Sequence, residues 1–191
     1  IDRGYDKVYC IVRGQDSERL AMTLEWYFGR GFAASSKRRI TAFCGDILQE
    51  NFGLEPSVKD MLLREVGMVI HAAADVRHYA AGDGAFRTNR DGTRHAVSFS
   101  VAAGARLVYI STVSLGSEFV REYPELPRNF SEDDFDIGQN WSDNVYLKGK
   151  FEGERIVRQA AGGGHPVMIL RVGRLVGRSS DGGFQKNPST N

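Results

Sequence analysis

The sequence has 191 residues, of which 41% are hydrophobic and 26% are charged, and its formal net charge is +1. This composition predicts one soluble globular domain, and no apolar run is long enough to cross a bilayer. A net charge near zero provides no field for nucleic acid, and the basic cluster at 37–39 is explained by an exposed turn. We therefore expect neither nucleic-acid binding nor a membrane-embedded protein.

The two cysteines, Cys10 and Cys44, both fall in short apolar runs and lack the Cys-x-x-Cys spacing of redox and metal sites. They predict a reducing, cytoplasmic setting and no metal site. The sequence starts at Ile1, without an initiator Met or a signal peptide, and its first strong segment follows almost at once. We therefore expect a fragment of a longer protein.

Segments typical of strands and helices alternate along the chain. Apolar runs predict strands at 7–12, 40–44, 68–70, 106–110 and 167–170. Helical spacing predicts helices at 16–28, 56–66 and 85–103, and one that carries Tyr146 and ends at Gly162. The stretch 113–140 is irregular and acidic, and 171–191 is typical of a loop. Because βα units follow one another without a repeat or linker, we expect one doubly wound parallel sheet of the Rossmann type, an α/β fold.

Tyr146 and Lys150 lie four residues apart at the start of the last predicted helix, with Ser142 or Asp143 as its cap. Residues at this spacing share one helical face, so the ammonium can favour the phenolate and make the hydroxyl a proton donor or acceptor. An ordinary helix face with a half-buried tyrosine has the same spacing. The choice between a catalytic Tyr–Lys pair and an ordinary helix face therefore depends on the residues at the ends of the predicted strands.

In a doubly wound sheet, ligands bind beyond the carboxyl ends of the strands. Arg13 follows the first strand, where a guanidinium suits a ribose 2′-phosphate, and its alternative is an exposed strand-end arginine. Asp46 follows the second strand, where an acid can accept a hydrogen bond from an adenine amino group, and its alternative is a turn.

Small residues follow the third and fourth strands. Ala72, Ala73 and Ala74 leave room for close ligand approach, or for tight packing alone. Ser111 and Thr112 place two hydroxyls near the expected position of the tyrosine, or form a turn. Each feature is ambiguous alone, but their order along the chain is specific.

That order resembles the extended short-chain dehydrogenase/reductases over nearly the whole chain, with Thr112, Tyr146 and Lys150 matching the Ser/Thr, Tyr and Lys of that family. Further motifs resemble, more narrowly, the thioester reductase domains of nonribosomal peptide synthetases and related carrier-protein enzymes. These motifs are VYCIVR at 8–13, HAAADV at 71–76, NRDGT at 89–93, YISTVS at 109–114, FSEDDFD at 130–136, RVGR at 171–174 and SDGGFQ at 180–185.

The resemblance implies NADPH-dependent reduction of an acyl or peptidyl thioester to an aldehyde or alcohol, with the thioester on the phosphopantetheine arm of a carrier protein that we expect in the same polypeptide. Thr112 and Tyr146 are expected to stabilise the carbonyl oxygen, with Tyr146 as proton donor and Ser114 as the fallback for Thr112. Lys150 is expected to hold the nicotinamide ribose. The implied cofactor-binding residues are Arg13, Asp46, Ile47, Ala72, Ala73, Ala74, Asn89, Ser111, Tyr146 and Lys150.

The sequence departs from the family at both ends. The family opens with a strand and a Gly-rich phosphate-binding turn, neither of which precedes Ile1, and most of its C-terminal substrate region would follow Asn191. We therefore expect residues 1–191 to be a reductase domain truncated at both ends and inactive by itself. Two alternatives stay open, an NAD(P)-dependent sugar-nucleotide epimerase or dehydratase and a non-catalytic cofactor-binding fragment.

Overall fold

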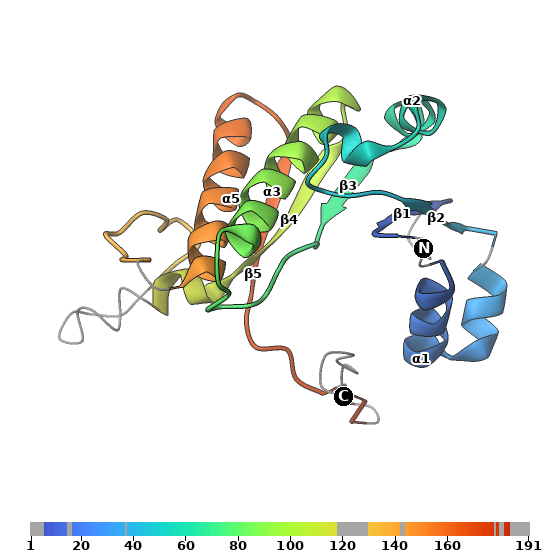
Figure 1. The fold of residues 1–191 in the computed structure, drawn as a ribbon, viewed down its shortest axis with the longest axis horizontal. Helices are drawn as coiled ribbons and strands as arrows, with labels where there is room; N and C mark the ends of the chain where they lie inside the picture. The colour runs from blue at the N-terminus through green and yellow to red at the C-terminus, as the bar shows by residue number, and fades with distance from the viewer. Residues whose placement is uncertain are drawn as a thin grey trace. The chain divides into compact units, whose positions relative to one another are not determined.

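The structure is a computed structural model, and it describes residues 6–14, 17–36, 38–117, 130–141, 144–177, 179 and 182–183. The chain divides into two compact units, one formed by Ile1–Asp46 with Arg174–Asn191 and the other by Ile47–Gly173. Parallel strands alternate with helices along the chain (Figure 1). The predicted α/β class of the Rossmann type is therefore confirmed.

The first unit contains two parallel strands, β1 (Val8–Val12) and β2 (Ile40–Cys44), connected by α1 (Ser17–Ser36). The predicted helix 16–28 corresponds to the first helical segment of α1, which ends where the backbone leaves the helical conformation at Gly29. Its φ of 81° and ψ of 163° break α1 into two helical segments, the second of which continues to Ser36. Glycine adopts this positive φ readily because it lacks a Cβ.

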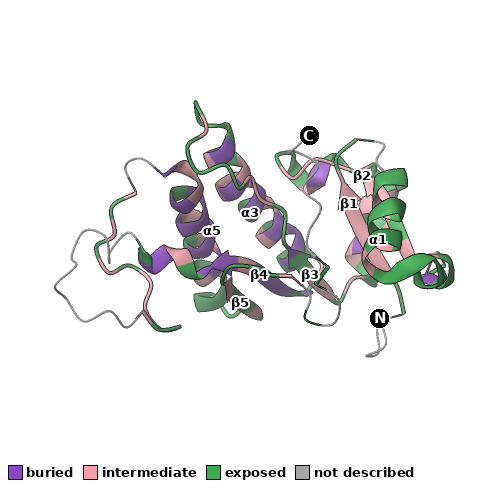
Figure 2. Ribbon diagram, turned by 90° about the horizontal axis from the view of Figure 1, so that it is seen from below, coloured by how far each residue is buried: buried purple, intermediate pink, exposed green. Residues whose placement is uncertain are grey.

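The second unit contains three parallel strands in the order β3-β4-β5, and α3 and α5 lie side by side on one face of this sheet (Figures 1 and 2). Its elements are η1 (Glu50–Gly53), α2 (Pro56–Glu65), β3 (Met68–His71), α3 (Gly84–Ala102), β4 (Arg106–Thr112), η2 (Val113–Gly116), α5 (Val145–Gly162) and β5 (Val167–Val172). Every helix in the described ranges is too short or too polar to traverse a lipid bilayer.

The strands of the second unit extend past their predicted ends. Ser111 and Thr112 belong to β4, and Arg171 belongs to β5 rather than to a loop. The parallel register pairs Ser111 with Arg171 and Thr112 with Val172. Sequence pattern alone misplaced these ends because the last strand residues are polar, whereas the apolar runs stop earlier.

The core of the second unit lies between its sheet and the helices. Leu107 and Tyr109 of β4 form a fully buried cluster with Val157 of α5. Side chains alternate between the faces of a strand, so Ser111 continues the face of Leu107 and Tyr109 toward the carboxyl end of β4. The partly buried residues Val69, Val97, Val167 and Ile169 pack against this cluster.

Two glycines allow α5 to approach α3 closely. A Cβ at Gly149 would lie 2.8 Å from the Cβ of Asn89. A Cβ at Gly153 would lie 2.5 Å from the hydroxyl oxygen of Tyr109 and 3.0 Å from the carbonyl oxygen of Asn89. Either side chain would displace buried atoms, so these positions set the distance between the two helices.

Gly153→Ala should lower the free energy of unfolding by about 1–3 kcal/mol, because overpacking displaces Tyr109 or the α3 backbone. This expected loss is a net value, because the higher helix propensity of alanine alone would raise the free energy of unfolding by about 1 kcal/mol. Gly162→Ala in the same helix is the control, since its added Cβ has nothing within 4 Å among the described atoms. Urea denaturation measures both variants, and a Gly153→Ala chain as stable as the control would contradict the spacing argument.

Candidate functional site

The start of α5 is fixed by Asn144 and by the loop after β3. The side-chain oxygen of Asn144 caps the helix by accepting a hydrogen bond from the backbone N–H of Leu147 at 3.0 Å. Its amide nitrogen lies 3.1 Å from Nδ1 of His78, whose carbonyl oxygen accepts from the N–H of Val145. The cap is therefore Asn144, and the expected caps Ser142 and Asp143 lie outside the described residues.

Tyr146 projects from the first turn of α5 and is half-buried, with its ring centroid 4.7 Å from that of His78. Burial raises the pKa of Tyr146, and a hydrogen bond with the Thr112 side chain opposes that rise. The structure thus brings together the predicted pair Thr112 and Tyr146. The raised pKa keeps the phenol protonated at neutral pH, and the stabilisation of its phenolate by Lys150 stays a prediction.

Thr112 ends β4 and is buried. Its hydroxyl oxygen accepts a hydrogen bond from the backbone N–H of Ser114 at 3.2 Å. This contact fixes the oxygen and leaves the hydroxyl proton available for donation. Ser114 is partly buried in η2, and its predicted role as the fallback for Thr112 stays a prediction.

Lys150 lies one turn after the tyrosine, and only 4% of it is exposed. Its ammonium donates a short hydrogen bond to the carbonyl oxygen of Ile110 and lies 4.3 Å from the ring centroid of Tyr109. Burial lowers the pKa of Lys150 to about 8, although the charge of Glu154 raises it. Lys150 is therefore a buried cation directly beside the strand that carries Thr112.

Asn89 of α3 holds the loop that follows β3. Its amide nitrogen donates to the carbonyl oxygen of Asp75, and its amide oxygen accepts from the N–H of Asp75, each at 2.8 Å. This double contact fixes the loop that contains Ala72, Ala73 and Ala74. Ala72 and Ala73 are exposed, so the small side chains predicted to contact a cofactor are accessible.

A neutral histidine completes the polar interior beneath this loop. Nε2 of His71 lies 3.1 Å from the hydroxyl oxygen of Thr93, whose own proton is donated to the carbonyl oxygen of Asn89. Nε2 must therefore carry the imidazole proton and act as the donor. Burial and the nearby charge of Lys150 lower the pKa of His71 to about 4.

Three further predicted cofactor residues follow β1 and β2, whereas the predicted cofactor residue Ser111 is buried in β4 and donates its hydroxyl proton to Glu154. Arg13 directly follows β1 and is exposed, and Asp46 lies two residues after β2 and is partly buried, both in the first unit. Ile47 begins the second unit, where its carbonyl oxygen accepts a hydrogen bond from Nδ1 of His95 at 2.8 Å. The placement of these three residues on a cofactor stays a prediction.

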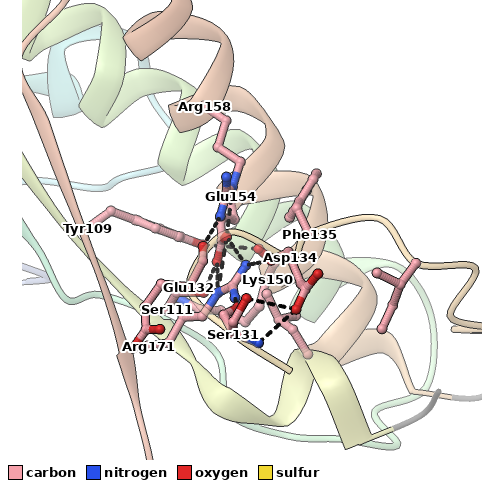
Figure 3. Close-up of polar contacts among 12 residues, drawn as sticks. Tyr109, Ser111, Ser131, Glu132, Asp134, Phe135, Lys150, Glu154, Arg158 and Arg171 are labelled. Atoms are coloured by element: carbon pink, nitrogen blue, oxygen red, sulfur yellow. Dashed lines mark hydrogen bonds and ion pairs between the residues drawn. The ribbon is translucent and has the colours of Figure 1, made fainter. Parts of the chain in front are cut away.

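Sequence reasoning missed the buried polar residues that lie one turn beyond Lys150. Glu154, one turn further along α5, is fully buried and contacts Ser111, Arg158 and Arg171 (Figure 3). Applying the same four-residue spacing to Lys150 would have pointed to Glu154. Arg171 is part of the RVGR motif, to which sequence reasoning assigned no role.

The chemistry available at this site is proton donation beside a fixed cation. Tyr146 is a neutral phenol next to the Thr112 hydroxyl, and Lys150 is an ammonium whose pKa of about 8 leaves it mostly charged at neutral pH. Two hydroxyls and a cation can stabilise a developing oxyanion and protonate it.

The low pKa of Lys150 predicts a pH-dependent stability. Between about pH 8 and about pH 10.4, the folded chain binds fewer protons than the unfolded chain, so its stability rises with pH in that window. From about pH 7.5 to about pH 9.5, the free energy of unfolding should rise by about 2 kcal/mol more than in Lys150→Met, which has no titrating ammonium. Denaturation at both pH values measures the difference, and parallel pH profiles for the two proteins would contradict the assigned pKa.

Comparison with known proteins finds similarity to peptide and lipopeptide synthases and to a solved part of a peptide synthetase. An isonitrile lipopeptide synthase of Streptomyces coeruleorubidus is 28% identical over 183 residues, which are 92% of this chain and 12% of that protein. A linear gramicidin synthase of Brevibacillus parabrevis is 28% identical over 185 residues, or 94% of this chain and 4% of that protein. A solved thiolation-reductase di-domain from an archaeal nonribosomal peptide synthetase is 36% identical with a TM-score of 0.79, and the match covers 97% of this chain and 39% of that one.

The chain therefore spans less than half the length of each of these proteins. The reductase domain of the aureusimine biosynthetic cluster is also similar, with 25% identity and a TM-score of 0.74, and the match covers 97% of this chain and 47% of that one. These similarities confirm the resemblance to reductase domains of nonribosomal peptide synthetases. A family model matches residues 2–190, and the chain belongs to the NAD-binding family described as "Male sterility protein".

Proposed function

We propose that this chain carries the catalytic centre of an oxidoreductase that uses NADPH to release an acyl or peptidyl group from a carrier-protein thioester as an aldehyde or alcohol. The observation that carries the proposal is the placement of Tyr146 one turn before the buried cation Lys150 on α5, with the Thr112 hydroxyl near enough to lower the pKa of the tyrosine. Similarity to reductase domains of peptide synthetases supports the thioester as the substrate class.

The residues fit a bound nicotinamide dinucleotide. The exposed side chains of Ala72 and Ala73 leave the backbone after β3 open to a flat ligand, and the Lys150 ammonium is proposed to donate to the ribose hydroxyls of a bound cofactor. Bound NADPH would supply a hydride for the thioester carbonyl carbon. Arg13 is proposed to contact the 2′-phosphate, and the Asp46 carboxylate to accept from the adenine amino group.

The protein's own groups would handle the proton and the developing charge. The hydroxyls of Thr112 and Tyr146 donate hydrogen bonds to the carbonyl oxygen as it becomes an oxyanion, and Tyr146 then donates its proton to that oxygen. The resulting hemithioacetal expels the pantetheine thiol and leaves the aldehyde. Lys150 stabilises the phenolate that remains until Tyr146 is reprotonated.

A carrier protein in the same polypeptide is the proposed partner. The similar archaeal protein is a thiolation-reductase di-domain, in which a carrier and a reductase lie in one chain. The matched relatives are likewise much longer than this chain. Activity should therefore be measured with the full-length protein and its own loaded carrier.

Tyr146→Phe in the full-length protein should lower thioester-dependent NADPH oxidation by about a hundredfold to ten-thousandfold, because it removes the proton donor at nearly constant volume. Tyr79→Phe is the matched control, since Tyr79 is 76% exposed and lies in the loop after β3. Tyr79→Phe should turn over like the wild type. Turnover of Tyr146→Phe within about twofold of the wild type would place the acid elsewhere.

Arg13→Ala should raise the Kd for NADPH by about tenfold or more and that for NADH by less than about twofold, because only NADPH loses a charge-assisted phosphate contact. Arg155→Ala is the control, because Arg155 pairs with Glu152 on the exposed side of α5. Calorimetric titration with each cofactor gives both constants. Equal losses for the two cofactors would mean that Arg13 does not read the phosphate.

A further inference from the structure

Glu154 is a fully buried carboxylate that joins three elements at one point (Figure 3). It accepts hydrogen bonds from the Ser111 hydroxyl of β4 at 2.6 Å and from Nη2 of Arg171 of β5 at 2.7 Å. Nε of Arg158, on its own helix, donates to it at 3.0 Å. These donors outweigh the effect of burial and lower the pKa of Glu154, so the carboxylate is ionised.

The two strand residues that contact Glu154 are partners in the sheet. Ser111 of β4 pairs with Arg171 of β5 in the parallel register. Their shared contact therefore holds the carboxyl ends of both strands against α5. Thr112 is the next residue of β4 after Ser111, and Lys150 lies one turn before Glu154 on α5. The Glu154 carboxylate therefore lies next to both Thr112 and Lys150 along the chain elements that carry them.

Arg171 extends this connection to the acidic segment 130–136. Its guanidinium donates to the carbonyl oxygens of Ser131 at 2.8 Å and Asp134 at 2.5 Å, and its central carbon lies 4.6 Å from the ring centroid of Phe130. Arg158 also donates to the carbonyl oxygen of Glu132 at 3.2 Å. The segment is thus held by its main chain, which gives the FSEDDFD motif a structural role.

Charge links Glu154 to Lys150 as well. The titratable groups that face Lys150 are Glu154 of α5, Tyr109 of β4 and His71 of β3. Of these, Glu154 is the anion, and its charge opposes the desolvation of the Lys150 ammonium. Without that carboxylate, the buried ammonium would lose the charge that opposes its desolvation.

We propose that Glu154 is a positioning residue for the reaction, which fixes the end of β4 that carries Thr112 and stabilises the charge of Lys150. Arg171 holds the carboxylate in place and fastens segment 130–136 to the same point. The inference about reaction rate rests on the proposed function, whereas the inference about the Lys150 charge does not.

Glu154→Gln in the full-length protein should lower kcat by about tenfold to a hundredfold, with KM for the loaded carrier within about twofold, because the catalytic geometry is displaced and substrate contacts are kept. The fall of activity at alkaline pH should also move to lower pH, because Lys150 loses its proton more easily. Glu152→Gln is the matched control, since Glu152 lies on the same helix in a more exposed pair with Arg155. A merely structural role would lower activity without moving the pH profile.

A second measurement separates this proposal from the proposed function. In the 191-residue chain without substrate, the Lys150 side-chain nitrogen is followed by ¹⁵N NMR against pH, with its signal assigned by Lys150→Met. The wild-type midpoint should lie at about pH 8, and that of Glu154→Gln should be lower. If Glu154→Gln lowers the Lys150 midpoint but the full-length protein does not reduce thioesters, only the proposed function is rejected. If the Lys150 midpoint is the same in Glu154→Gln and the wild type, the proposed effect of Glu154 on the Lys150 charge is wrong.

Glu154→Asp covers the case in which Glu154→Gln does not fold. It keeps the charge but shortens the reach to Ser111, so kcat should fall by about tenfold while the alkaline limit stays in place. Values of kcat within about twofold of the wild type would overturn the positioning role.

Discussion

The buried ammonium of Lys150 is the constraint on which the second unit depends. A buried charge is tolerated only with hydrogen-bond partners and a compensating charge. The carbonyl oxygen of Ile110 accepts a hydrogen bond from the ammonium, the ring face of Tyr109 lies against it, and Glu154 supplies the opposite charge one turn along the helix. The contacts with Ile110 and Tyr109 need α5 close to the sheet, and that approach depends on the absence of a side chain at Gly153.

The same face of the sheet changes from apolar to polar toward its carboxyl end. Along β4, Leu107 is followed by Tyr109 and Ser111 at alternate positions, and along β5, Val167 and Ile169 are followed by Arg171. The apolar end provides the buried cluster that contributes to stability. The polar end buries less apolar surface and therefore contributes less to stability, but it fixes the charged groups in place, as is common at functional sites.

The sequence predicted the parts of this arrangement that follow a local period. The spacing of Tyr146 and Lys150 and the alternation of apolar runs with helical segments were sufficient to place the α/β order and to group Thr112 with Tyr146. The four-residue spacing from Lys150 was enough to point to Glu154, but its full burial and its contacts across the sheet were not predictable, because a glutamate in a charged helix usually faces solvent. Arg171 was assigned to a loop, because a charged residue after an apolar run resembles a strand end until the register with β4 is known.

The protonation states of the site fit the direction of the proposed reaction. A reduction requires a phenol that gives up a proton, and burial raises the pKa of Tyr146, so the donor form is populated in the free protein. The Lys150 ammonium favours the phenolate only once the proton has left, when a negative charge exists for it to stabilise. Its pKa of about 8 keeps it mostly protonated at neutral pH, and the Glu154 carboxylate favours that state. On the proposed mechanism, the Glu154 carboxylate therefore acts on Tyr146 through Lys150, although it does not contact the substrate itself.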